Sequence, residues 1–151
     1  MSQGILSALS FLQSSIEAIT PKSDQHHGFV CLGRGSGAVQ PLENRPNSNR
    51  FFELSIRDYP ADDGAAGLSG RRRSVIECRV RYDIPDDLLY RQRQMSEDCE
   101  KILTTLKGPN YDLASTGIVS IIPEQPIVEP LDFEENAHMM VLPFTLLYLE
   151  S

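Results

Sequence analysis

The chain has 151 residues, of which 40% are hydrophobic and 23% are charged. These proportions are typical of one soluble globular domain with a single core. The formal net charge of −7 argues against a protein that binds nucleic acid by neutralising its phosphates. No apolar stretch is long enough to span a bilayer as a helix, so we expect a protein outside the membrane.

The cysteines and the charges limit the possible classes further. Cys31, Cys78 and Cys99 are far apart and odd in number, which favours small core residues in a reducing compartment over a disulfide framework or a metal site. All 14 Lys and Arg residues fall within residues 1–111, whereas 7 of the 21 acidic residues fall within residues 112–151. The last segment therefore carries the whole net charge, and we expect it to repel DNA or to meet a basic partner.

Residues 2–20 are predicted to form an amphipathic helix that ends at Pro21. Its apolar positions recur at intervals of three and four residues: Ile5, Leu9, Leu12, Ile16 and Ile19. Glu17 is its only charged residue, and serines occupy much of the other side. This face fits a plain surface helix, and it fits equally well a helix that contacts something beyond its own core.

Two strands are predicted in the next part of the chain, with one long loop at about 21–49 before the first strand and another at about 58–73 between the two. A short strand at 29–32 is expected inside the first loop. Residues 51–57 and 74–84 alternate between apolar and polar side chains, which is typical of half-buried strands. We expect these two strands to pair in antiparallel fashion.

A long helix is predicted to start at Pro85-Asp86-Asp87 and to end at Gly108-Pro109. One face is expected to hold Leu88, Gln92, Met95, Cys99, Ile102, Leu103 and Leu106, with Arg91, Arg93, Glu97, Asp98 and Lys101 outside it.

Two strand-like runs follow this helix, at 117–122, continuing irregularly to residue 131, and at 138–150. Both faces of residues 139–149 are apolar, so this last strand is expected in the centre of the sheet, with a bulge at Pro143. The order of elements predicts a single α+β domain: one mostly antiparallel sheet with two main helices packed on one face.

No pattern in the chain predicts catalysis, a cofactor or a metal ion. The loop Gly33–Gly37 lacks the Gly-Lys-Ser/Thr ending and the following helix of a phosphate loop. His26 and His27 are adjacent, which is not a ligand spacing for a helix. Arg71–Arg73 is the one concentrated basic patch; it is either solvated or a contact for phosphate or an acidic partner surface, and no interleaved aromatic residue supports base stacking.

The arrangement of these elements resembles the tail terminator (tail-completion) proteins of long-tailed bacteriophages. The resemblance rests on the first helix, on a strand that leads directly into the long helix, and on a final strand that runs to the end of the chain. The corresponding residues are Ile5 to Ile19, V-I-E-C-R-V-R-Y-D-I-P (Val75 to Pro85), D-D-L-L-Y-R-Q-R-Q-M (Asp86 to Met95) and M-V-L-P-F-T-L-L-Y-L-E (Met140 to Glu150). It covers nearly the whole chain apart from residues 21–49 and 123–130.

The resemblance implies a structural virion protein without enzymatic activity or cofactor. Tail terminators form a hexameric ring on the last ring of tail-tube protein, end tube polymerisation and present the surface to which the head connector binds. DNA passes through the central hole without sequence-specific binding. The protein would be assembled in the host cytoplasm and found in the neck of the virion, without a membrane partner.

A ring of this kind needs two complementary surfaces on one protomer. The candidate interface residues are Arg71, Arg72, Arg73, Arg79 and Arg81, facing Glu129, Asp132, Glu134 and Glu135 of a neighbour. Alternatively, some of these acids line the hole, where a negative wall would let DNA slide without sticking. The loop 58–73 is a candidate arm that orders on meeting the tube or the connector.

Three other functions remain open on the sequence. A head-side neck protein, either an adaptor or a stopper, would also form rings but would bind portal-side rings. A small enzyme would use the Gly33–Gly37 loop to bind phosphate or a nucleotide. A generic regulatory binding domain would stay monomeric beside every tail component.

Overall fold

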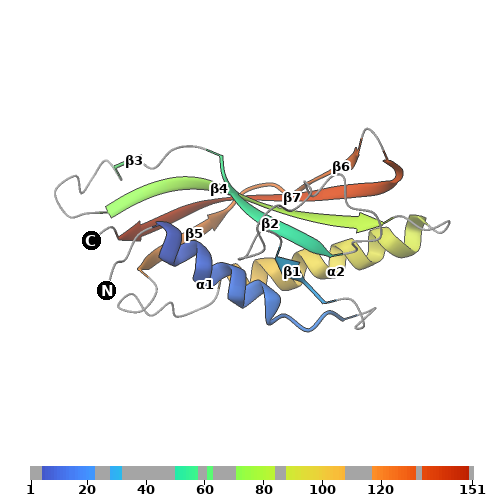
Figure 1. Cartoon of the computed structure of the whole chain (residues 1–151), viewed down its shortest axis with the longest axis horizontal. Helices are drawn as coiled ribbons and strands as arrows, with labels where there is room; N and C mark the ends of the chain where they lie inside the picture. The colour runs from blue at the N-terminus through green and yellow to red at the C-terminus, as the bar shows by residue number, and fades with distance from the viewer. Residues whose placement is uncertain are drawn as a thin grey trace, which may run out of the picture.

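A computed structural model describes residues 5–22, 28–31, 50–57, 61–62, 71–83, 88–107, 117–131 and 134–149. Helix α1 spans Ile5–Glu17 and helix α2 spans Leu88–Leu106. The strands are β1 Val30–Cys31, β2 Phe51–Ile56, β3 Ala61–Asp62, β4 Arg71–Asp83, β5 Ile118–Pro123, β6 Ile127–Leu131 and β7 Glu134–Leu149. Figure 1 shows one twisted sheet with both helices on the same side of it, α1 under one half and α2 under the other.

The centre of the sheet is a long antiparallel ladder between β4 and β7. It runs without a register shift from the pair Arg71 and Leu149 to the pair Asp83 and Ala137. The strand order is β1-β2-β4-β7-β5, with β3 also paired to β4 and β6 also paired to β7. The β1–β2 pair is parallel, and the other described pairs are antiparallel. The predicted α+β fold, with two helices on one face of a mostly antiparallel sheet, is confirmed.

The main core lies between the sheet and the two helices. Alternate residues of β4 point into it, and Ile76, Cys78, Val80 and Tyr82 are fully buried there as the alternation predicted. The predicted apolar face of α1 is also confirmed, since Leu9, Leu12 and Ile16 are buried. The other contributors are Ala8, Phe29, Cys31, Phe52, Met95, Ile102, Leu106, Ile118, Met140, Leu142, Phe144, Leu146 and Tyr148.

Strand β7 is buried on both faces. Ala137, Met139 and Val141 point away from the main core and form a second small buried cluster with Phe51. Their neighbours Met140 and Leu142 point into the main core. The two-sided apolar pattern therefore correctly predicted a central strand, because a strand with one face in water alternates instead.

The expectation of a bulge at Pro143 is wrong. Pro143 pairs with Glu77 of β4 in an unbroken register, and the register shifts lie at Ile118/Ser120 and Pro130/Leu131. The Pro143 carbonyl accepts a bond from the Glu124 amide at 2.9 Å, on the side away from β4. The nitrogen of Pro143 points to that same side, where β5 has ended and β6 has not begun, so the missing N–H removes no bond to β4.

The predicted element boundaries need two further corrections. The loop expected at 58–73 is shorter, because β3 occupies Ala61–Asp62 and Arg71–Arg73 already belong to β4. The predicted inner face of α2 is partly wrong: Gln92 is exposed, whereas Gln94 and Asp98 are buried. The predicted start of this helix at residues 85–87 lies outside the described residues.

Candidate interaction surfaces

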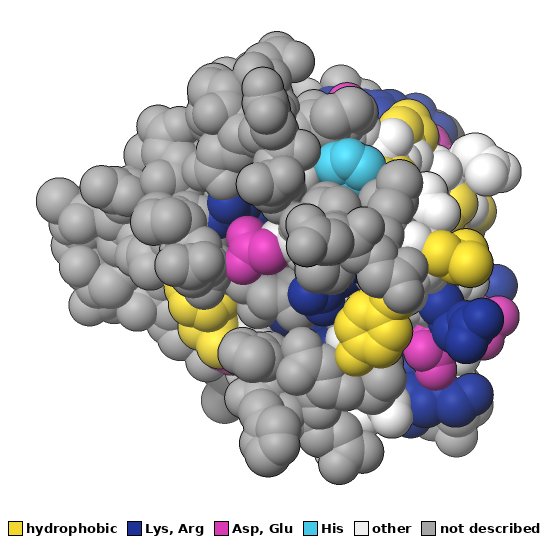
Figure 2. All heavy atoms as spheres, turned by 90° about the vertical axis from the view of Figure 1, so that its right-hand side faces the viewer, with side chains coloured by type: hydrophobic (Ala, Val, Ile, Leu, Met, Phe, Trp, Pro, Cys, Tyr) yellow, Lys and Arg dark blue, Asp and Glu magenta, His cyan; other side chains and the backbone are white. Residues whose placement is uncertain are grey.

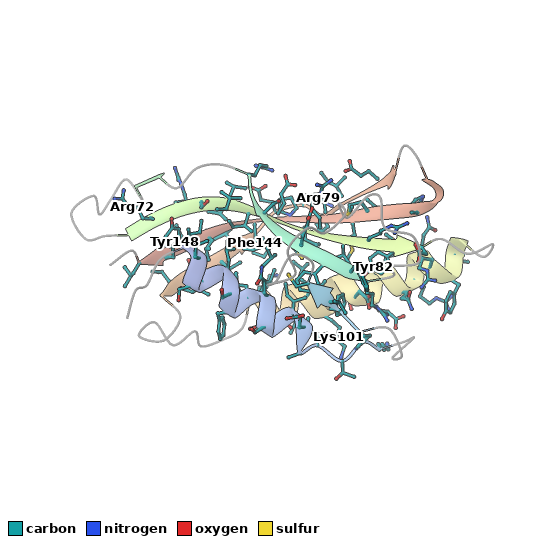
Figure 3. All side chains as sticks on the ribbon, viewed as in Figure 1. Arg72, Arg79, Tyr82, Lys101, Phe144 and Tyr148 are labelled. Carbon is teal, nitrogen blue, oxygen red and sulfur yellow. The ribbon has the colours of Figure 1, made fainter. Side chains whose placement is uncertain are left out.

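The β4–β7 ladder separates the two charged segments of the chain. The arginines 71–73 open β4 and pair with the last residues of β7, while Glu134 opens β7 beyond the point where β4 ends. A 13-residue strand is about 40 Å long at about 3.3 Å per residue. Figure 3 shows this separation, with Arg72 at one end of β4 and Tyr82 near the other. Within one protomer the two segments are therefore too far apart to form ion pairs.

The arginine cluster lies on a strand and not in a loop. Arg73 is exposed and Arg72 is half-buried, and successive residues of a strand point to opposite faces of the sheet. Strand β3 runs beside them, with Asp62 opposite Arg72 and Ala61 opposite Arg73. The side chain of Arg71 lies outside the described residues. Two cations of the predicted cluster are thus presented on either side of one end of the sheet.

Arg79 and Arg81 do not belong to this surface. The Arg79 guanidinium lies 3.6 Å from the Glu53 carboxylate on the neighbouring strand β2. Arg81 is only 1% exposed, and its guanidinium lies 3.3 Å from the Asp83 carboxylate. Both charges have partners within the protomer, and a neighbouring protomer cannot reach Arg81 without opening the fold. The expectation that Arg81 offers an accessible contact is wrong, because the alternation of β4 does not reveal what covers its polar face.

Three of the predicted acidic residues lie on the two strands of the β6–β7 hairpin, called the acidic hairpin below: Glu129 on β6, and Glu134 and Glu135 on β7. Glu129 is exposed on β6, opposite Met139. The backbone of Glu134 pairs with Leu131 across the hairpin, which brings Glu135 to the same end. Asp132 and the side chains of Glu134 and Glu135 lie outside the described residues. Figure 2 looks onto this end, where basic, acidic and hydrophobic side chains lie close together on the part of the surface that is not grey.

An apolar groove of about 370 Å³ lies beside the acidic hairpin, between α2 and strands β6 and β7. Its lining residues are Gln92, Met95, Ser96, Cys99, Glu100, Pro126, Val128 and Met140. Met95 and Met140 are buried, Cys99 is half-buried, and Val128 is half exposed. The sequence did not single out this groove, because it depends on how α2 crosses the sheet.

A buried polar network holds α2 in this position. The Arg50 guanidinium donates to both Asp98 carboxylate oxygens, at 2.6 and 3.1 Å, and the Tyr82 hydroxyl donates to Asp98 at 2.7 Å. Arg50 has a φ of 65°, which is uncommon for a residue other than glycine. Its amide donates to the Arg81 carbonyl and its carbonyl accepts from the Val30 amide. The turn before β2 is thereby tied to α2, β4 and β1.

The network also perturbs the acid–base chemistry of Tyr82. Burial and the neighbouring Asp98 carboxylate raise the pKa of Tyr82 well above its ordinary value, because both disfavour the phenolate. Sequence reasoning missed this network, although Asp98 falls three residues after Met95 and four before Ile102, on the apolar side of the helix.

No catalytic or metal centre emerges from the described part of the chain. Among its residues, no group of three or more His, Cys, Asp and Glu side chains is arranged to hold a metal ion, and neither helix is long and apolar enough to cross a membrane. His26, His27 and the Gly33–Gly37 loop lie outside the described residues. A scan of protein-family models and a search of curated proteins both find no match for the chain.

Proposed function

We propose that this protein is a structural subunit of a phage neck, a tail terminator that caps the tail tube as a hexameric ring. In this role it ends tube polymerisation and provides the docking surface for the head connector. The observation that supports the proposal best is the placement of the arginine cluster and the acidic hairpin at opposite ends of the β4–β7 ladder. The proposal also draws on the resemblance in the order of elements.

Opposite charges at opposite ends suit a head-to-tail assembly. A ring forms when one surface of a protomer binds a different surface of the next and the rotation closes. Arg72 and Arg73 would face Glu129 and the acidic hairpin of the neighbour, with Arg71, Asp132, Glu134 and Glu135 as further members of the two surfaces. Complementary charge would fix the order of the subunits and speed their encounter more than it would raise affinity.

The acidic hairpin has a second proposed role at the hole of the ring. Glu129 is exposed, and a set of such carboxylates from every subunit would make a wall that repels phosphate. DNA would then pass without sticking, since tight binding to DNA requires cations that neutralise its phosphates. No enzymatic step and no cofactor is needed for either role.

The experiment that tests this function is a mass measurement by light scattering, with and without tail-tube protein. We expect a hexamer, either in the free protein or on tube ends, and tubes that stop growing when the protein is added. A protein that forms rings but binds portal-side rings in a pull-down, and not tube protein, would be a head-side adaptor or stopper. A monomer under all these conditions would refute the assignment.

A further inference from the structure

We propose that the apolar groove between α2 and β6 is the docking site for helix α1 of a neighbouring copy of this chain. The inference deepens the proposed ring function and rests on it, because it names the surfaces that join successive subunits. It is carried by four features: the apolar lining of the groove, the uncharged outer face of α1, their placement at opposite ends of the protomer, and the charges beside each.

The groove has the composition of a protein contact more than of a small-molecule site. The buried side chains of Met95 and Met140 line it together with Val128 and Pro126. Methionine side chains are flexible and polarisable, so they can repack around an incoming aromatic ring. The polar lining residues Gln92, Ser96 and Glu100 all come from α2 and are exposed, whereas small-molecule sites converge polar groups on a ligand.

The outer face of α1 offers a matching surface. Leu6 is 75% exposed and Phe11 is 39% exposed, and the small residues Ser10 and Ser14 lie exposed between them. A helix that faces only water usually carries charged residues on its outer side. The single charged residue of α1, Glu17, instead accepts a bond from the Cys31 amide of β1 at 3.3 Å. The outer face of α1 is therefore uncharged and carries two large apolar side chains that are at least partly exposed.

Helix α1 cannot fill the groove of its own protomer. Figure 1 shows α1 starting under the half of the sheet where β4 begins, while β6 and the first turns of α2 lie at the opposite end. The α1 that occupies the groove in this proposal is therefore that of another copy of the chain. Because the two surfaces are different patches of one chain, their contact is head-to-tail, which is the kind of contact that closes into a ring.

The charges near the two surfaces favour the same pairing. Arg72 and Arg73 lie at the end of the sheet under which α1 begins. At the groove, Glu100 is an exposed lining residue and Glu129 follows the lining residue Val128 directly. Seating α1 of one copy in the groove of the next would bring these cations toward these carboxylates. Complementary charge around an apolar contact selects this register over the reverse one.

Cys99 supplies a direct probe of the groove. It lines the groove and is half-buried, whereas Cys31 and Cys78 are buried in the core. Burial raises the pKa of the Cys99 thiol, so alkylation with iodoacetamide should be slow and is best followed at about pH 8.5. Intact-mass measurement of the folded monomer should show one adduct, and Cys99→Ser should abolish it. In the assembled ring the docked helix should slow this alkylation at least tenfold.

The test combines Cys99 alkylation with light scattering on the full chain and its variants. Leu6→Ser with Phe11→Ser, and separately Val128→Asp, should raise the dissociation constant of the assembly at least tenfold and return Cys99 to the monomer's alkylation rate. Val30→Ser is the matched control, because Val30 is 43% exposed on β1 and belongs to neither surface. Circular dichroism should show that all variants keep the fold, since each changed side chain is at least partly exposed.

The outcomes separate this inference from the proposed function. Rings that bind tube protein but leave Cys99 as reactive as in the monomer, or that tolerate the Leu6 and Phe11 changes, would overturn the docking of α1 and leave the ring function standing. Oligomers with protected Cys99 that ignore tube protein would support the docking and refute the tail-terminator function. A protein that is monomeric throughout would refute both.

Discussion

Arg50 and Asp98 form a fully buried, two-point ion pair between the turn before β2 and the middle of α2. Both side chains are inaccessible to solvent, and the Tyr82 hydroxyl donates to the same carboxylate. A buried pair of this kind adds little net stability compared with apolar residues of the same shape, but removing one partner leaves an uncompensated charge in the core. It therefore restricts where α2 can lie on the sheet, and with it the shape of the groove.

Replacing Asp98 alone should destabilise the protein strongly. Asp98→Ala strands the Arg50 guanidinium in the core, and we expect the free energy of unfolding to fall by about 3–5 kcal/mol. Urea denaturation followed by circular dichroism measures this loss. The double variant Arg50→Met with Asp98→Leu should recover most of it, because no buried charge remains. Arg57→Ala breaks the exposed pair with Glu77 and should cost less than about 1 kcal/mol.

Stability should decrease at alkaline pH through Tyr82. The unfolded tyrosine ionises near pH 10, whereas the folded protein keeps its proton because the pKa is raised. The unfolded state then binds fewer protons than the native state, so stability is constant below about pH 9 for this group and falls as the pH rises above 10. A difference of one bound proton between the two states changes the free energy of unfolding by about 1.4 kcal/mol per pH unit.

Tyr82→Phe isolates this contribution. It removes the hydroxyl and its bond to Asp98, so the free energy of unfolding should fall by about 1–2 kcal/mol at pH 7. Above pH 10, the free energy of unfolding should fall less steeply with pH than in the unchanged protein, by the contribution of about one proton. The remaining slope includes the Cys78 thiol, whose pKa is also raised by burial. Urea denaturation from pH 7 to 11 measures both effects, and equal slopes in the two proteins would contradict this assignment.

Pro143 should be replaceable at little cost. Its nitrogen faces the gap between β5 and β6 and its side chain is buried, so Pro143→Val loses no ladder bond and keeps an apolar side chain of similar size. The free energy of unfolding should change by less than about 1 kcal/mol, mainly through the flexibility of the unfolded chain. Leu142 points its amide toward β4, because backbone directions alternate along a strand. Leu142→Pro should therefore destabilise the protein more than the matched Leu142→Ala. Similar losses from the two would show that this amide makes no bond.

Reversing charges should test the contact between the two ends of the protomer. Arg73→Glu should weaken ring assembly about tenfold at low salt, and adding Glu129→Arg should restore it, because the two reversed surfaces match again. The effect should shrink at high ionic strength, where surface charges are screened. Lys101→Glu is the control, since Lys101 is an exposed cation on α2 that Figure 3 shows away from both ends. Equal effects of Arg73→Glu and Lys101→Glu would point to net charge and not to a specific contact.

Neutralising the acidic hairpin should separate its two proposed roles. Glu129, Asp132, Glu134 and Glu135 are replaced together by Gln or Asn. Weaker ring assembly in light scattering would indicate contacts between subunits, whereas intact rings with slower DNA ejection would indicate a wall of the hole. If both ring formation and ejection are unchanged, neither role holds.

The secondary structure and the main core followed from local periodicity. The alternation in β4 and the three- and four-residue spacing in α1 identified Val80, Leu12 and Ile16 as core residues, because burial on one face imposes that pattern directly. The two apolar faces of β7 identified the central strand in the same way. These features depend on residues close together in the sequence, and they can therefore be predicted without knowledge of the fold.

The sites that sequence reasoning missed depend on contacts between distant segments. Asp98 looked like a surface residue of α2 because its partner, Arg50, lies beside a long stretch of turn-forming residues with no periodicity. Arg81 alternates with buried apolar residues and so looked exposed, although it is covered on the other face of the sheet. Pro143 suggested a bulge because the break between β5 and β6, which accommodates it, cannot be placed before the register of β7 is known.

The ladder between β4 and β7 also determines when the protein can fold during its synthesis. Every pair in it joins residues separated by the whole of α2, β5 and β6, and within the described residues β5 and β6 themselves pair with β7 alone. While β7 is still inside the ribosome, the backbone edge of β4 that later pairs with β7 has no partner and must be kept from other chains. Folding should therefore be slow and concerted, and should wait until β7 has been made, because it depends on contacts of long sequence separation. Premature association of subunits would be limited by the same delay, because the acidic hairpin and the groove both require β7.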